Sequence, residues 1–419
     1  MSSIDYSDVQ GLVRYGFGGM TECCFHLVKV RDVRAASAWL ASAPVTTAEE
    51  RNPPPTRALQ IAFTSQGLEA LAVPNSVITG FSAEFVAGMT GDENRSRRLG
   101  DNGANSPDSW RWGHGEKVPH LLIMIYAKQE LSNWEQSVKG EHWDTAFEVI
   151  DRLATSQLGE REPFGFVDGI SQPRVDFDRK RRISGDQLQY SNMLALGEFL
   201  LGYPNEYGEY TDRPLVDPTD MTAQLLPAEN QADKKDLARN GTYLVMRQLE
   251  QDVRGFWRFL DTATGSNPQA RQKLAEAMVG RTVDGAPLLA LCNSIDGVGP
   301  DQPDMGYNQY TYQGDDGGNQ CPIGSHIRRA NPRNADFPQP VKGLISRLVR
   351  ILGFGRKDIR DDLMAPTRFH RILRRGREYG PDLFVPEALE PAPANDPERG
   401  LHFVCLNSNI ARQFEFVQS

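Results

Sequence analysis

Apolar residues in the first part of the chain gather into short runs with the spacings of strands and helices. The runs at 24–30, 58–63 and 118–127 are apolar over most of their length, which is typical of buried strands. The spacing of apolar residues at 35–40, and in the segment that starts at Leu68, favours helices. Strands that lie far apart in sequence, with helices between them, indicate antiparallel sheet packed against helices.

The same pattern begins again after a polar stretch. Residues 179–240 are rich in Gly, Pro, Asp and Asn, and they predict a long connection with little regular structure. Beyond this stretch the pattern predicts strands at 242–247 and 401–407 and helices at 249–260, 271–278 and 410–417. We therefore expect an α+β protein with an N-terminal domain of residues 1–178, a connecting region of residues 179–240 and a C-terminal domain of residues 241–419.

Length and charge narrow the class of protein. A chain of 419 residues is long for one small core, which supports two domains or one large domain of duplicated design. The net charge of −9 argues against nucleic acid as the main partner. No apolar run approaches the roughly 18 residues of a membrane span. The first residues, MSSIDYSDVQ, show no export signal, so we expect a cytoplasmic protein.

The cysteines exclude several kinds of site. There are five of them, Cys23 and Cys24 are adjacent, and none forms a CxxC or CxxCH pair. We therefore expect neither a disulfide framework, nor a structural zinc site, nor covalently attached haem, and we interpret the cysteines as small buried residues.

Among the seven histidines, His326 has the most distinctive surroundings. A single histidine is more often a packing or surface residue than a ligand, and no HExxH spacing marks a non-haem metal site. The segment CPIGSHIRRANPR, however, surrounds His326 with Arg328, Arg329 and Arg333. A neutral imidazole beside guanidinium groups suits a ligand that combines an iron with anionic groups, as haem does with its two propionates.

Two further segments carry candidate chemistry. In FGFVDGISQP the carboxylate of Asp168 lies among apolar residues, where its proton affinity can be adjusted for acid–base work. Taken alone, the Asp168–Gly169 pair is more often a simple turn. In FHRILRRGREYG the residues Arg371, Arg374 and Arg375 lie close together, and a solvated basic helix is the plain alternative.

Together, these three segments resemble those of the dye-decolourising peroxidase family. The GxxDG signature of that family matches residues 165–169, and its proximal segment matches Cys321, Pro322, His326 and Arg333. The later arginine segment matches Arg374, Gly376, Tyr379 and Gly380. The similarity extends over nearly the whole chain and includes VQGLV, WRWG, GEFLLGYPNEYG and the terminal FVCLNSNIARQFEFVQ.

This resemblance implies a fold, a cofactor and a reaction. The fold would be two ferredoxin-like α+β modules of the dimeric α+β barrel kind, with one haem b per chain held mainly by the C-terminal module. The reaction would be the reduction of hydrogen peroxide and the one-electron oxidation of dyes, phenols or other organic donors. Because a carboxylate base stays ionised in acid where a histidine is protonated, we expect an acidic optimum for dye oxidation.

The resemblance also implies a role for each candidate residue. His326 would bind the iron, Asp168 would move the proton of peroxide, and Arg374 would stabilise the negative charge that develops, although Arg371 or Arg375 remain alternatives. The other candidates are Arg328 and Arg333 for the cofactor, Leu401 and Phe403 for the wall of the distal cavity, Glu415 as the acceptor from His326, and Tyr379 and Trp257 as electron relays to the surface. A surface carboxylate at Glu415 and a core tryptophan at Trp257 are the plain alternatives.

Other functions remain open at this point. A haem-handling or iron-releasing protein with low turnover is the main alternative, and a duplicated α+β protein without haem is another. A homo-oligomer is possible. Residues 341–357 read VKGLISRLVRILGFGRK and predict an amphipathic basic helix, which would pack on the protein itself, form a subunit interface or contact a membrane surface.

Overall fold

The fold is that of a computed structural model. It describes residues 4–156, 161–179, 192–289, 306–308, 310–312, 314–315, 317–331, 333 and 366–419. Residues 341–357, where we predicted a basic helix, lie outside this part of the chain. No described helix is both long enough and apolar enough to cross a bilayer.

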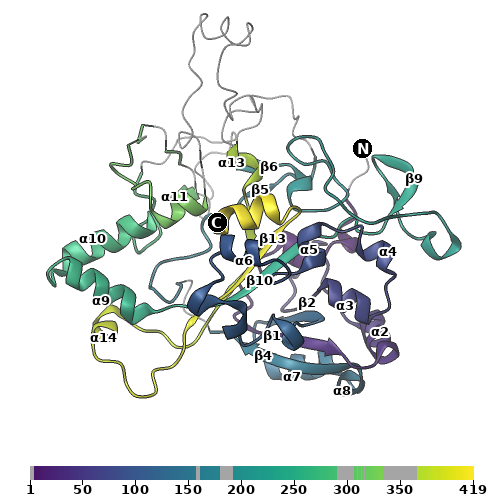
Figure 1. Cartoon of the computed structure of the whole chain (residues 1–419), viewed down its shortest axis with the longest axis horizontal. Coiled ribbons are helices and arrows are strands. Elements are labelled where there is room, and N and C mark those ends of the chain that lie inside the picture. The colour runs from purple at the N-terminus through teal and green to yellow at the C-terminus, as the bar shows by residue number, and fades with distance from the viewer. Residues whose placement is uncertain are drawn as a thin grey trace, which may run out of the picture.

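The N-terminal half is built on a four-stranded antiparallel sheet in the order β2-β3-β1-β4 (Figure 1). Its strands are β1 (Glu22–Val30), β2 (Arg57–Phe63), β3 (Leu121–Ala127) and β4 (Phe147–Ala154). All of the residues of β3 are buried, which explains its unbroken apolar sequence. Helices α2 (Val33–Ser42), α7 (Leu131–Lys139) and α8 (Trp143–Ala146) cover one face, where Trp39, Trp143 and Phe147 pack together.

The second sheet collects strands from the C-terminal half of the chain. Strands β10 (Tyr243–Glu250) and β13 (Gly400–Asn407) pair along their whole length, and β11 (Leu373–Arg374) and β12 (Arg377–Tyr379) pair with the other side of β13. Helices α9 (Val253–Ala263), α10 (Pro268–Val279) and α14 (Val385–Leu389) form a separate group at the end of the molecule away from α2 and α4 (Figure 1).

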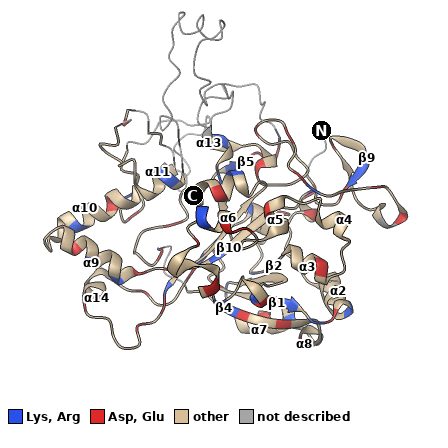
Figure 2. Ribbon diagram, in the orientation of Figure 1, with Lys and Arg blue, Asp and Glu red and all other residues tan. Residues whose placement is uncertain are grey.

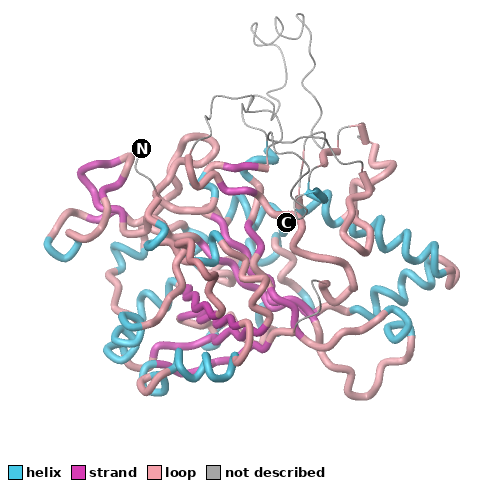
Figure 3. The backbone as a smooth tube through the Cα atoms, turned by 180° about the vertical axis from the view of Figure 1, so that it is seen from behind, coloured by secondary structure: helices cyan, strands magenta, loops and turns pink. Residues whose placement is uncertain are grey.

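The two sheets share one hydrophobic core. Phe25 and Tyr126 of the first sheet pack in one cluster with Leu373, Val404 and Leu406 of the second. The strands of both sheets lie at the centre of the molecule when it is seen from behind (Figure 3). The opposite face of the second sheet forms another cluster with residues of the helices around it, including Leu99 and Phe414. The second sheet is therefore covered on both faces.

The remaining elements are short. The other helices are α1 (Gly11–Arg14), α3 (Ser65–Ala70), α4 (Asn75–Ile78), α5 (Ala83–Ala87), α6 (Glu93–Arg98), α11 (His326–Ala330), α13 (Pro366–Phe369) and α15 (Phe416–Gln418). The other strands are β5 (Arg174–Val175), β6 (Met193–Leu194), β7 (Leu215–Val216), β8 (Pro227–Ala228) and β9 (Gln231–Asp236). Single 3-10 turns occur at Tyr6–Asp8, Gly103–Asn105, Pro107–Ser109, Gly115–Lys117, Leu196–Glu198, Asp220–Thr222 and Gly306–Asn308, and a π-helical turn at Ala411–Glu415.

The predicted α+β class with antiparallel sheets and flanking helices is confirmed. The predicted helix 249–260 begins later, at Val253, because Leu249 and Glu250 still pair with β13. In the described part of the connecting region, β7, β8 and β9 form a small sheet of their own. Acidic and basic residues are interspersed along the described ribbon (Figure 2). The domain boundaries at 178 and 240 stay predictions.

Candidate active site

Asp168 lies in a loop whose shape depends on glycine. Gly165 and Gly169 have φ values of 100° and 81°, in the left-handed region that favours glycine over other residues. Arg161 donates from Nη1 to the carbonyl of Gly165 at 2.7 Å, and Phe166 is buried in the cluster that contains Trp257. The loop is thus fixed on the N-terminal side of Asp168.

Arg374 reaches Asp168 from the second sheet. Its Nη1 donates to Oδ1 of Asp168 at 2.6 Å, although the two residues are 206 positions apart. The side chain of Gln172 ties the two segments together, because its Oε1 accepts from the backbone N–H of Arg374 and its Nε2 donates to the Arg374 carbonyl, both at 3.1 Å. The Asp168 loop and β11 therefore form one unit.

The two other arginines of this segment, Arg371 and Arg375, form hydrogen bonds with other partners. Arg375 donates to the carbonyls of Leu12 and Val13, at 2.7 and 3.1 Å. Arg371 is buried and donates to Oδ1 of Asn192 at 3.1 Å. Of these three arginines, Arg374 is the one that contacts Asp168 in the described part of the chain.

His326 lies near enough to this pair for their charges to act on it. It is the first residue of α11, a helix that packs against α10 and α15. The side chain of His326 is accessible to solvent, but many protein atoms lie around it. The resulting loss of solvation lowers the pKa of His326, and the positive charge of Arg374 lowers it further. The negative charge of Asp168 partly opposes this shift. The charges of Arg374 and Asp168 both act on the imidazole, so the three side chains belong to one site.

The pKa of Asp168 also departs from its ordinary value. Burial alone would raise the pKa of Asp168, but the charge and hydrogen bond of Arg374 outweigh it and lower the pKa, with smaller help from the Gly169 N–H and from His326. The site therefore combines an ionised carboxylate, which can accept a proton, with a neutral imidazole, whose nitrogen lone pair can bind a metal.

These properties fit an iron porphyrin. Iron needs the neutral form of imidazole, and within the described residues neither ring nitrogen of His326 makes a hydrogen bond. A carboxylate–guanidinium pair beside that imidazole offers a base and a positive charge to a small oxygen ligand. The donor set thus suits haem together with peroxide.

Arg328 and Arg333 make buried contacts with the protein itself. Nη1 of Arg328 donates to the Cys321 carbonyl at 2.7 Å and pairs with Asp315 at 3.2 Å. Arg333 donates to the carbonyls of Asn308 and Tyr310, at 2.9 and 2.7 Å, and lies over the Tyr310 ring. These contacts hold the segments around His326 together, and the role of the two arginines toward a cofactor stays a prediction.

Leu401 and Phe403 lie on the face of β13 that Arg374 shares. Arg374 pairs with Cys405, and side chains alternate along a strand, so Leu401, Phe403 and Cys405 point to the same side. His402 points to the other side, where Nε2 lies 2.9 Å from the Ala154 carbonyl. This orientation separates His402 from the site, and the part of Leu401 and Phe403 in a distal wall stays a prediction.

Glu415 lies near α11 but is engaged by arginines. It directly precedes α15, which packs against α11. Its carboxylate forms an ion pair with Nε of Arg95 at 3.0 Å and accepts a hydrogen bond from Nη2 of Arg98 at 2.5 Å. Among the described residues no hydrogen bond joins Glu415 to His326, so the predicted acceptor role stays a prediction.

The two relay candidates differ in their surroundings. Tyr379 is 9% exposed, stacks on His402 with ring centres 4.6 Å apart, and donates to the Leu249 carbonyl at 3.3 Å. Trp257 is 4% exposed and packs in the core of α9 and its neighbours. Neither role as a relay is tested by these contacts.

Sequence reasoning missed Gln172. This residue lies four positions after Asp168, inside the quoted FGFVDGISQP segment, and an amide side chain in such a segment is a usable signal. Its partner Arg374, however, is distant in sequence, so the interaction emerges only in the folded chain.

The chain is similar to known peroxidases over its full length. No protein-family model matches it. Peroxidase 2 of Mycetinis scorodonius is 26% identical, covering 99% of this chain and 72% of the relative. The dye-decolorizing peroxidase of Exidia glandulosa is 27% identical, covering 100% of this chain and 74% of the relative.

Solved structures show the same fold. A decolorizing peroxidase from Auricularia auricula-judae superposes with a TM-score of 0.70 at 23% identity, over 99% of this chain and 83% of that one. This match confirms the predicted duplicated, ferredoxin-like α+β fold. The full-length similarity and the shared fold together confirm that the chain resembles the dye-decolourising peroxidases.

Proposed function

We propose that this protein is a haem peroxidase that reduces hydrogen peroxide with electrons from dyes, phenols and related organic donors. The resemblance to dye-decolourising peroxidases implies a haem cofactor, and we propose one haem b per chain, with His326 as the residue that holds the iron. The single observation that carries the proposal is the ion pair of Asp168 and Arg374 at 2.6 Å, whose charges act on His326.

The chain supplies the proton chemistry of the reaction. When bound, haem supplies the redox chemistry that cleaves the O–O bond and stores the oxidising equivalents. Arg374 holds Oδ1 of Asp168, so we assign proton transfer to Oδ2. There the carboxylate takes the proton of peroxide and returns it to the oxygen that leaves as water. The guanidinium of Arg374 stabilises the negative charge that develops on that oxygen.

Known relatives support the choice of donor. They include proteins named as dye-decolorizing peroxidases, and one solved structure of this fold is a dye-decolorizing peroxidase in complex with 2,6-dimethoxyphenol. A haem-handling protein with low turnover is not favoured, because such a protein has no need of an ionised base paired with a guanidinium beside the iron ligand.

The test uses the purified holoprotein. An absorption spectrum should show a Soret band, and hydrogen peroxide together with an anthraquinone dye or a phenol should give many turnovers per haem. A Soret band without turnover would support the haem-handling function instead. A preparation that binds no haem at all would refute both.

A further inference from the structure

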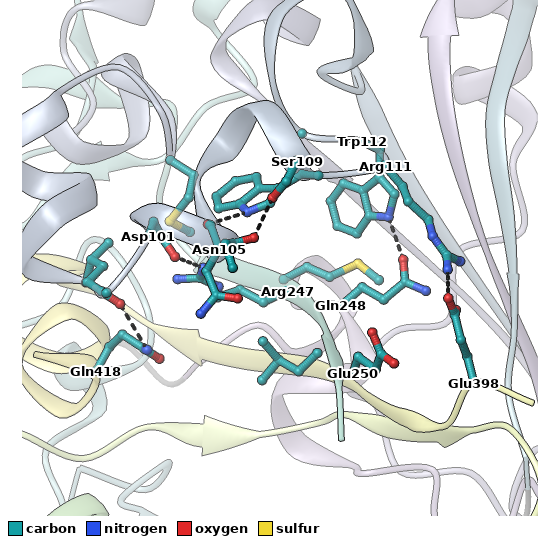
Figure 4. A pocket seen from close by; sticks show the side chains of 18 of the residues that line it. Asp101, Asn105, Ser109, Arg111, Trp112, Arg247, Gln248, Glu250, Glu398 and Gln418 are labelled. Carbon is teal, nitrogen blue, oxygen red and sulfur yellow. Dashed lines mark hydrogen bonds and ion pairs between the residues drawn. The ribbon is translucent and has the colours of Figure 1, made fainter. Parts of the chain in front are cut away.

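A pocket of about 690 Å³ runs along β10, the edge strand of the second sheet (Figure 4). Its other wall is the segment of residues 99–113. The residues that line this pocket do not include Asp168, His326 or Arg374, so the pocket is separate from the candidate active site. The volume lies in the range of pockets that hold small organic molecules.

Aromatic rings form much of the wall. Trp110, Trp112 and Tyr379 line the pocket, together with the apolar side chains of Met89, Leu99, Met246 and Leu249. Nε1 of Trp112 donates to Oε1 of Gln248 at 2.8 Å, and Nε1 of Trp110 donates to the Asn105 carbonyl at 3.0 Å. Because protein acceptors already satisfy the indole N–H groups, the rings are fixed and offer chiefly their faces to a ligand.

The charges of the pocket disfavour an anion. Two arginines line it, and each is already paired with a carboxylate of the same lining, Arg247 with Asp101 and Arg111 with Glu398 (Figure 4). The lining also contains Glu250, which is exposed and has no ion pair with any residue in the described ranges. Three carboxylates against two guanidiniums leave one net negative charge, which repels an anionic ligand.

We propose that this pocket binds planar aromatic reductants that carry no negative charge, such as neutral phenols. Stacking on the tryptophans would hold the ring, and the polar side chains of Asn105 and Gln248 would meet hydroxyl or methoxy groups. That such a ligand donates electrons to this protein rests on the proposed function. Because Tyr379 lies in the wall, a bound phenol would lie against the residue that we predicted as an electron relay.

The test is calorimetric titration of the resting holoenzyme without peroxide, so that binding is measured independently of turnover. The probes are coniferyl alcohol and ferulate, which share a methoxyphenol ring and differ in that ferulate carries a carboxylate. Coniferyl alcohol should bind at least about threefold more tightly than ferulate. Glu250→Gln should reduce this preference while changing the affinity for coniferyl alcohol little.

Two variants test whether the rings of Trp110 and Trp112 contribute to ligand binding. Trp110→Leu and Trp112→Leu should each weaken the binding of coniferyl alcohol by about fivefold or more, because each removes a stacking surface. Trp134→Leu is the matched control, since Trp134 is also half-buried but lies on α7, outside the pocket. Absence of binding to the parent protein, tighter binding of ferulate, or equal losses in Trp134→Leu would each overturn the proposal. A protein that binds coniferyl alcohol but does not turn over would instead refute the peroxidase function alone.

Discussion

Removing the guanidinium of Arg374 should change how the peroxide reaction depends on pH. In the parent protein the positive charge of Arg374 keeps the pKa of Asp168 below its ordinary value. In Arg374→Leu the desolvation of Asp168 remains without the opposing charge, so the pKa of Asp168 rises. A base works when it is ionised, which requires a pH above its pKa. The acid limb of the pH–rate profile should therefore move to higher pH.

The size of this change follows from the ion pair. Two unit charges about 4 Å apart interact by about 1 kcal/mol in water and about 4 kcal/mol at an effective dielectric constant of 20. The side chains of Arg374 and Asp168 are 27% and 32% exposed, so we take an intermediate value of about 2 kcal/mol. At about 1.4 kcal/mol per factor of ten, the rate on the acid limb should fall about 30-fold more than the rate at neutral pH.

Stopped-flow mixing with excess hydrogen peroxide between about pH 3 and pH 8 measures this profile through the change in the Soret band. The variant should also be slower at every pH, because it lacks the charge that we propose stabilises the departing oxygen, so the shape of the profile is the decisive quantity. Arg377→Leu is the control, since Arg377 donates to the carbonyls of Gly16 and Phe17 instead. An acid limb at the same pH in Arg374→Leu and in the parent would refute the reasoning.

Three further results are expected. His326→Ala should fold, as judged by circular dichroism, but lack a Soret band because it loses the nitrogen that we propose binds the iron; a full band would rule out His326 as the ligand. Asp168→Asn should keep its haem yet react with peroxide about 10²–10⁴-fold more slowly in stopped flow, since an amide cannot take up the proton, and unchanged rates would remove Asp168 from the mechanism. Tyr379→Phe should oxidise a bulky anthraquinone dye more slowly at an unchanged rate of peroxide reduction, because it lacks the phenol that we predict as the relay; equal dye oxidation would end that role for Tyr379.

Much of the architecture was present in the amino-acid pattern. The apolar run that became β3 predicts a strand buried on both faces, and its residues are indeed all buried. The return of the strand–helix pattern after residue 240 predicts a second antiparallel sheet, which β10 and β13 form. Such periodicities show which side of a segment is buried, and the spacing of the buried residues differs between a strand and a helix. The GxxDG segment likewise predicts a turn, because its glycines permit backbone conformations that other residues avoid.

Only the tertiary structure decided which of these residues work together. Arg371, Arg374 and Arg375 are indistinguishable by composition, but β11 places Arg374 on the Cys405 side of the sheet, while Arg375 reaches the carbonyls of Leu12 and Val13. The sequence also did not predict the contacts that Arg328 and Arg333 make with their own loops. Nor did it predict the pocket beside β10. The physical reason is that these contacts join residues distant along the chain, and a one-dimensional pattern records burial but not the partner that provides it.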